Sequence, residues 1–161
     1  MSNLKNLLSI LILLMFTQSY GFSKEFIGVI SAGIGDITNQ NDEKLSTGSK
    51  IFDGDTIFVK EKSNAQILLL DETALTIGEK SELTIDEFSF DTSVIPIKLA
   101  MNVSVNVGTF TYESGAVSTL GGEVNITAGN ATITVQGTAF SGRVDVNGRT
   151  TITLLPDSTG N

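Results

Sequence analysis

Three acidic pairs and one Asp-Gly-Asp turn are the residues of this chain best suited to acid–base or metal chemistry. The pairs are Asp42-Glu43, Asp71-Glu72 and Asp86-Glu87, and the turn is Asp53-Gly54-Asp55. The chain contains no histidine and no cysteine, which removes Ser-His-Asp and Cys-His catalysis and the usual zinc sites. An enzyme would have to work with carboxylates, lysine, tyrosine or serine.

The surroundings of these carboxylates do not favour a catalytic or metal site. Each pair falls where a turn or a strand end is expected, and acids beside turns are common in soluble β proteins. Sugar hydrolysis needs two carboxylates across a cleft that is usually lined with aromatic side chains, and the chain has two tyrosines and no tryptophan. A calcium loop needs roughly six or more oxygens, and the residues around Asp53 and Asp55 follow no known spacing. We expect no catalytic residue, no metal site and no cofactor.

Residues 1–23 have the order of a secretory signal peptide. Met1 to Lys5 carries one positive charge, residues 7–16 are almost wholly apolar, and residues 17–23 are small and polar. The apolar segment of about ten residues is too short for a bilayer, which needs about twenty. Small residues favour cleavage after Ser23, with cleavage after Gly21 or an uncleaved N-terminal anchor as alternatives. We expect an exported chain, periplasmic or extracellular, with no transmembrane anchor after cleavage.

Acidic residues dominate the charge of the remaining chain. Loss of Lys5 with the signal leaves nine basic residues against eighteen acidic ones, a net charge near −9. Such a surface repels phosphate backbones and anionic lipid headgroups, so we expect no nucleic-acid partner. Without cysteines there is no disulfide framework, and stability must come from the core. A chain of about 138 residues buries about two-thirds of its unfolded surface, which is enough for one domain.

Apolar residues recur with a period of two, which is typical of β-strands. The segment Ile97 to Val107 alternates without a fault, so one face is expected in the core and one in water. The buried parity changes between Ile85 and Phe88 and again across Gly108, which predicts a bulge or bend at each place. No window of about eleven residues shows helical periodicity. The expected strands are residues 26–31, 56–59, 65–70, 74–77, 83–90, 97–107, 109–113, 123–127, 131–135, 138–146 and 150–155.

Two further patterns concern local geometry. Residues 67–70 are four consecutive apolar positions, which predicts a strand buried on both faces. Asn147-Gly148 between two strands is a strong signal for a two-residue hairpin. Many short strands with closely spaced turns predict an all-β fold, which could be a sandwich, a barrel or a solenoid-like stack.

The segment from Leu45 to Phe88 places glycine turns and short strands in an order that resembles the FecR domain. A second segment, from Ala131 to Phe140, is similar to that family's later signature, in which a strand ends in Arg-Gly-Thr and an aromatic residue. Gln136 stands where the arginine is frequent, and its two amide donors replace only part of the arginine's bonding. The positions that match the first segment are Leu45, Gly48, Ile51, Gly54, Asp55, Ile57, Ser63, Ala65, Leu68, Asp71, Leu75, Ile77, Ser81, Leu83 and Ile85.

The resemblance implies an all-β domain of short strands in two packed sheets with a solenoid-like course. We assign this domain to residues 24–161 and expect it to be shortened at its C-terminus relative to the family, because the sequence stops just after a strand. A sheet edge left open in this way would be a place for a partner strand to add. The family-motif residues expected to shape turns and strands are Gly28, Gly48, Gly54, Asp55, Ala65, Asp71, Gly137, Thr138 and Phe140.

The family's namesake is a transmembrane regulator whose cytoplasmic segment controls a sigma factor and whose exported β domain senses a signal. The expected signal peptide begins at Met1, so we expect no cytoplasmic segment and carry over no sigma-factor function. The resemblance implies a non-catalytic exported module for protein interaction or sensing, with an unknown exported or membrane-associated protein as partner. The alternatives are a structural, adhesive or carbohydrate-binding surface protein, on the polar row Asn102, Ser104 and Asn106, and an enzyme that uses carboxylates.

Overall fold

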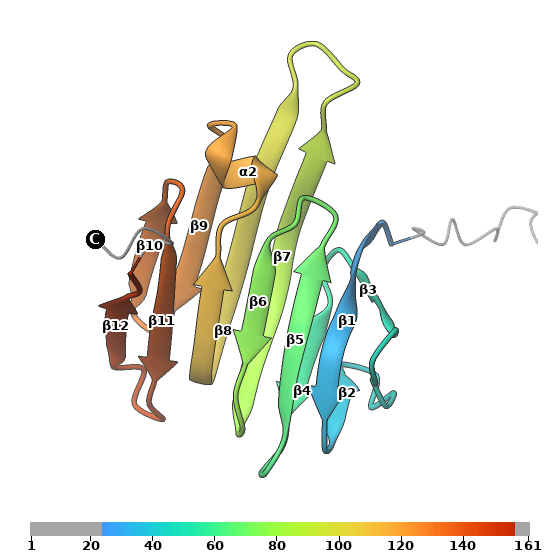
Figure 1. Cartoon of the computed structure of the whole chain (residues 1–161). Coiled ribbons are helices and arrows are strands. Elements are labelled where there is room, and N and C mark those ends of the chain that lie inside the picture. The colour runs from blue at the N-terminus through green and yellow to red at the C-terminus, as the bar shows by residue number, and fades with distance from the viewer. Residues whose placement is uncertain (1–23, 157–161) are drawn as a thin grey trace, which may run out of the picture.

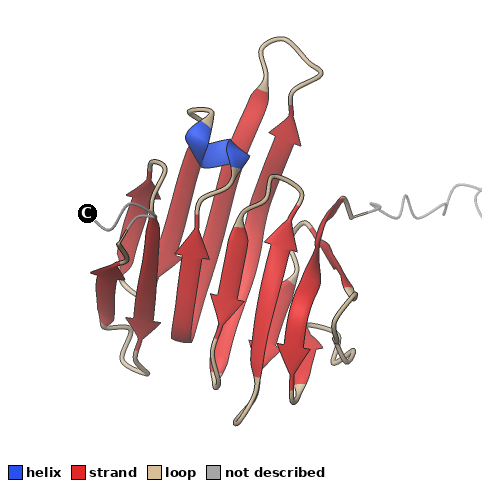
Figure 2. Ribbon diagram, in the orientation of Figure 1, coloured by secondary structure: helices blue, strands red, loops and turns tan. Residues whose placement is uncertain are grey.

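The computed structural model describes residues 24–156, which form twelve β-strands and one four-residue helix. The expected signal peptide and its cleavage position Ser23 lie outside the described residues. More than half of the described chain is strand and only one short helix occurs in it, which confirms the all-β prediction (Figure 2). The elements are β1 (Phe26–Ile34), β2 (Ile37–Asn39), β3 (Lys50–Phe52), β4 (Thr56–Val59), β5 (Asn64–Leu69), β6 (Ala74–Ile77), β7 (Ser81–Asp91), β8 (Lys98–Glu113), α2 (Ala116–Thr119), β9 (Glu123–Ala128), β10 (Ala131–Val135), β11 (Ala139–Val144) and β12 (Thr150–Leu154).

The long strand β8 joins the two halves of the sheet (Figure 1). Its first half pairs antiparallel with β7 and parallel with β9, and its second half pairs antiparallel with β6 and β11. We call β2-β4-β7-β8-β9-β10 the β7 arm and β3-β1-β5-β6-β8-β11-β12 the β6 arm. Because β8 belongs to both arms, the strands form one continuous curled sheet, whereas the family resemblance implied two packed sheets.

Gly108 allows β8 to pass from one arm to the other. Its φ is 107°, a conformation that residues with a Cβ rarely adopt, and an added Cβ would overlap the Ser81 side chain of β7. The buried parity of β8 changes here, from Val105 to Phe110, as the sequence predicted. The two expected strands 97–107 and 109–113 are thus one bent strand of 16 residues.

The second predicted change of parity lies in β7. The register of β7 on β8 shifts between Ile85 and Glu87, which is the signature of a β-bulge. Ile85 and Phe88 have opposite parity and are both buried. The bulge predicted between them is therefore confirmed.

One hydrophobic core fills the inside of the curl and takes side chains from both arms, such as Ile57 and Leu83 from the β7 arm and Phe110 from the β6 arm. The prediction that residues 67–70 are buried on both faces is wrong. Leu68 and Leu70 are 41% and 52% exposed, while their neighbours in the strand are buried. In the described chain no second layer covers the outer side of β5. Only the side chains on its inner face are therefore buried in the core.

The hairpin between β11 and β12 exists, but its loop differs from the predicted two-residue turn. The Asp145 N–H donates to the Arg149 carbonyl at 3.0 Å, which leaves the three residues 146–148 as the loop. Gly148 has a φ of 75°, and the Asp145 carboxylate accepts the N–H groups of Asn147 and Arg149. This carboxylate satisfies two backbone N–H groups of the longer loop, as Asp commonly does in turns.

Candidate functional site

The glycine and alanine members of the family motif shape the backbone. Gly48 and Gly54 lie in turns, with φ values of 89° and 75°. Gly28 lies in β1, where an added Cβ would be 2.5 Å from the Leu68 carbonyl oxygen, so glycine permits the close approach of β1 to β5. Ala65 is buried in β5.

Asp71 is a buried carboxylate, 1% exposed, at the turn between β5 and β6. Its Oδ1 accepts the Thr73 N–H at 3.0 Å, and its Oδ2 accepts the Thr73 hydroxyl at 2.8 Å and the Val117 N–H at 3.0 Å. The Asp71 carbonyl also accepts the Ala116 N–H, at 2.7 Å. Asp71 therefore holds α2 against the β5–β6 turn, and both oxygens of its carboxylate are hydrogen-bonded.

The later signature lies beside the same helix. Gly137 has a φ of 61°, and its N–H donates to Ser118 Oγ at 2.6 Å. The Thr138 N–H donates to Ser114 Oγ at 2.8 Å, and the Ser114 hydroxyl donates to the Thr138 carbonyl at 2.6 Å. The structure thus brings Asp71, Gly137 and Thr138 together around α2. The roles of Ser114 and Ser118 and the presence of α2 were not predicted from the sequence, because a helix of four residues leaves no periodic signal.

Phe140 completes this cluster from the inside. Its ring centroid lies 5.5 Å from that of Tyr112 and 5.9 Å from that of Phe110, and all three rings are buried. The Tyr112 hydroxyl is buried and has no hydrogen-bond partner among the described residues. Burial raises the pKa of Tyr112, although the hydroxyls of Ser114 and Ser118 lie close enough to lower it part of the way.

The turn Asp53-Gly54-Asp55 joins β3 to β4, and each carboxylate has its own backbone donor. Asp53 Oδ1 accepts the Phe88 N–H at 2.8 Å, and Asp55 Oδ2 accepts the Phe52 N–H at 2.9 Å. Asp55 Oδ1 also accepts Lys24 Nζ at 2.7 Å and Gln40 Nε2 at 2.9 Å. Burial raises the pKa of Asp55, but the bonds from Gln40, Lys24 and Phe52 outweigh it, so this pKa lies below its usual value.

The acidic pairs do not converge on one another. Asp42 and Glu72 lie in turns with positive φ, at 59° and 68°. The expectation that Asp86-Glu87 lies at a turn or strand end is wrong, because this pair sits inside β7 at the bulge. Within residues 24–156 no three acidic side chains come close enough together to hold a metal ion.

The polar row considered for carbohydrate binding, Asn102, Ser104 and Asn106, is hydrogen-bonded to acidic side chains of β7. Asn102 Nδ2 donates to Glu87 at 2.8 Å, the Ser104 hydroxyl donates to Asp86 at 2.6 Å, and Asn106 Nδ2 donates to Glu82 at 2.7 Å. These bonds run across β7 and β8 on the outer side of the β7 arm. The side chains of the row already have partners, so they are poorly placed to bind a sugar.

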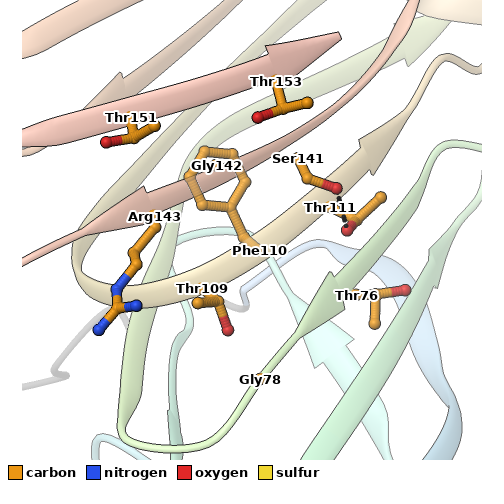
Figure 3. Close-up of a pocket in the computed structure, with 10 residues that line it drawn as sticks. All are labelled: Thr76, Gly78, Thr109, Phe110, Thr111, Ser141, Gly142, Arg143, Thr151 and Thr153. Carbon is orange, nitrogen blue, oxygen red and sulfur yellow. Dashed lines mark hydrogen bonds between the residues drawn. The ribbon is translucent and has the colours of Figure 1, made fainter. Parts of the chain in front are cut away.

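The outer side of the β6 arm carries a hollow of about 350 Å³ (Figure 3). Its walls come from β6, β8, β11 and β12 and carry hydroxyl groups and one guanidinium, that of Arg143. Thr111 and Ser141 share a hydrogen bond of 2.9 Å between their hydroxyl oxygens. The lining residues are Thr76, Gly78, Thr109, Phe110, Thr111, Ser141, Gly142, Arg143, Thr151 and Thr153.

Strand β12 forms an open edge of the β6 arm, since among the described residues it pairs with β11 alone. Arg149 and Leu155 are bonded through their main chains to β11 and its loop. In an antiparallel pair the bonded residues alternate, so the N–H and C=O groups of Thr150, Ile152 and Leu154 point away from β11. Leu154 is 72% exposed.

These features define a small all-β domain whose signature residues bond to its own turns and helix. Residues 55–157 match the FecR protein family, and the chain belongs to that family. Comparison with curated proteins gives no match, and comparison with solved structures gives none either. In the described part of the chain no helix has the length and apolarity that a membrane crossing requires.

Proposed function

We propose that this protein is a non-catalytic, exported interaction module that binds a partner protein by accepting one of its extended segments along β12. Membership of the FecR family suggests a sensor or regulatory domain, which is consistent with such a role. The observation that carries the proposal is the row of outward N–H and C=O groups at Thr150, Ile152 and Leu154. Strand addition to such an edge supplies affinity through main-chain hydrogen bonds.

The composition of β12 distinguishes it from the edge strands β2 and β3. Natural edge strands are protected by charges, prolines or very short length. β3 has three residues and carries Lys50, and β2 has three residues with an isolated bridge from Thr38 to Lys44 on its outer side. β12 has five residues, Thr-Thr-Ile-Thr-Leu, without a charge or a proline.

Strand β10 is a second uncharged edge, but its apolar side chains are better covered. Val135 is buried, and Ile133 packs against the core. Leu154 of β12 stays exposed. A partner segment with apolar residues at alternate positions would cover Leu154 while its backbone completes the ladder.

The test uses a proline that blocks the edge without touching the β11 ladder. Leu154→Pro removes an N–H that points outward and bulges into the path of an added strand, whereas Leu154→Thr keeps the N–H. A photoreactive benzophenone residue at position 155, introduced in the cells that make the protein, should give one adduct, mapped by mass spectrometry to an extended segment of another protein. We expect Leu154→Pro to abolish the adduct and Leu154→Thr to retain it, with both variants folded by circular dichroism.

Two results would overturn the proposal. An adduct of equal yield with Leu154→Pro would mean that contact at position 155 does not depend on the edge. An adduct formed only with a second copy of this chain would replace the partner by a dimer.

Export itself is tested separately by sequencing the N-terminus of the protein recovered from outside the cytoplasm. The proposal rests on the order of residues 1–23 and expects a chain that begins at Lys24. Recovery of a cytoplasmic chain that retains Met1 would contradict it.

A further inference from the structure

The strand register gathers hydroxyl side chains on the outer side of the β6 arm. Thr76 of β6 is opposite Thr111 of β8, Thr111 is opposite Ser141 of β11, and Ser141 is opposite Thr153 of β12. These four residues form one row across four neighbouring strands. Adjacent strands are about 4.8 Å apart, so the row presents hydroxyls at a nearly regular spacing.

A second row runs beside the first. Arg143 of β11 is opposite Thr109 of β8 on one side and Thr151 of β12 on the other. Gly78 continues this row towards β6, and an added Cβ at Gly78 would overlap the Thr109 hydroxyl, so the glycine helps to keep the hollow open. Figure 3 shows Arg143 at one end of the hollow, on the side of Thr109 and Thr151.

The polar groups of the hollow have spare bonding capacity. The hydroxyls of Thr76, Thr109, Thr151 and Thr153 form no side-chain hydrogen bond within residues 24–156, in contrast to the paired side chains of Asn102 and Asn106 on the β7 arm. Each free hydroxyl can donate one bond and accept two. Such groups suit a ligand that itself carries many hydroxyls.

The guanidinium of Arg143 favours a ligand that carries a negative charge. Its guanidinium is exposed and has no carboxylate within 4.0 Å in the described chain. Asp145 lies near enough for the positive charge of Arg143 to contribute to its lowered pKa, although bonds from the Arg149 and Asn147 N–H groups are the larger causes. A guanidinium presents a planar fork of donors that matches a carboxylate.

We propose that this hollow binds an acidic saccharide, with Arg143 on the carboxylate of a uronic acid unit and the threonine hydroxyls on the sugar hydroxyls. The hollow has no exposed aromatic ring to stack on a neutral sugar, because Phe110 is buried, so the charged contact is needed for affinity. A densely charged polyanion is disfavoured, because the whole chain has a formal charge of −8 and the hollow has one arginine. This inference is independent of the partner segment proposed for β12.

The test is a titration of the purified, isotope-labelled protein with a galacturonic acid trimer, followed by two-dimensional NMR. We expect amide shifts at Thr111, Ser141 and Thr151, and none with the neutral galactose trimer. Arg143→Gln should weaken binding about tenfold or more, as expected for loss of a charge-assisted hydrogen bond. Arg149→Gln is the matched control, because it removes the same charge from the residue that follows the hairpin loop, outside the hollow.

Thr111→Val tests the hydroxyl row separately, and we expect several-fold weaker binding from a variant of nearly the same shape. Equal shifts with sodium sulfate would overturn the assignment to a saccharide and leave a simple anion site. Equal loss of affinity in Arg143→Gln and Arg149→Gln would show an effect of net charge alone. Absence of any shift at millimolar trimer would reject the site.

Discussion

Asp71 and Val117 are joined by a buried hydrogen bond of 3.0 Å that spans 46 positions of the sequence. The same carboxylate accepts two bonds from Thr73, so it fixes its own turn and the first turn of α2 together. Gly137 and Thr138 reach this cluster through Ser118 and Ser114. Asp71 of the first signature and Gly137 and Thr138 of the second are therefore parts of one internal network around α2.

Removal of the Asp71 carboxylate should strongly destabilise the domain. Asp71→Ala leaves the Val117 N–H and both Thr73 donors unsatisfied in a buried place, and we expect a loss of about 3 kcal/mol or more in the free energy of unfolding. Urea denaturation followed by circular dichroism measures it. Glu72→Asn, at the neighbouring exposed position with φ of 68°, is the control and should cost nothing, because asparagine tolerates this conformation. A loss below 1 kcal/mol for Asp71→Ala would contradict the role of the network.

A side chain at Gly108 should disturb the passage of β8 between the arms. In Gly108→Ala the new Cβ overlaps Ser81 and lies 2.5 Å from its Cα, so the backbones of β7 and β8 must separate. We expect a loss of about 3 kcal/mol, of which the positive φ accounts for about 1–2 kcal/mol. Gly54→Ala provides the comparison, since Gly54 also has positive φ but nothing within 4 Å of an added Cβ. Equal losses in the two variants would mean that crowding at Ser81 has no effect.

The bend at Gly108 and the bulge after Ile85 could be predicted from the sequence, because both are local changes of parity between a buried and an exposed series. The exposure of Leu68 and Leu70 could not be predicted. The four consecutive apolar residues 67–70 predict a strand that is covered on both faces. Whether a second layer covers β5 depends on the rest of the fold, which this local pattern does not contain. α2 is too short for a periodic pattern, and its place is set by Asp71, which is far away in the sequence.

The same reasoning explains why the hollow on the β6 arm was not predicted. Thr76, Thr111, Ser141 and Thr153 come from four strands, and their alignment depends on the registers of three strand pairs. A shift of one residue in any pair would turn the side chains to the other face. The row Asn102, Ser104 and Asn106 was visible because it lies on one strand, but its pairing with acids of β7 depends on register too.

Acid should weaken the anchor of Lys24 on Asp55. The pKa of Asp55 is lower in the folded protein than in the unfolded chain, so its carboxylate stabilises the fold above about pH 4 and this contribution is lost as the pH falls through the folded pKa. Asp55→Asn should therefore show a smaller drop in unfolding free energy between pH 6 and pH 3 than the unmodified protein. Lys24→Met should destabilise the unmodified protein at pH 6 and have little effect in the Asp55→Asn background. Parallel pH curves for the two proteins would contradict this assignment.

Loss of the Tyr112 hydroxyl should be tolerated, unlike the loss of most buried tyrosine hydroxyls. The oxygen is buried without a hydrogen-bond partner in the described chain, and burying a polar group without a partner costs free energy. Tyr112→Phe keeps the ring against Phe140 and removes that cost, so we expect the free energy of unfolding to stay the same or to rise by about 1 kcal/mol. Ser118→Ala is the contrasting variant, because the Gly137 N–H loses its acceptor at 2.6 Å, and a loss of about 1–2 kcal/mol is expected. A loss above 1 kcal/mol for Tyr112→Phe would show that the hydroxyl is hydrogen-bonded in solution.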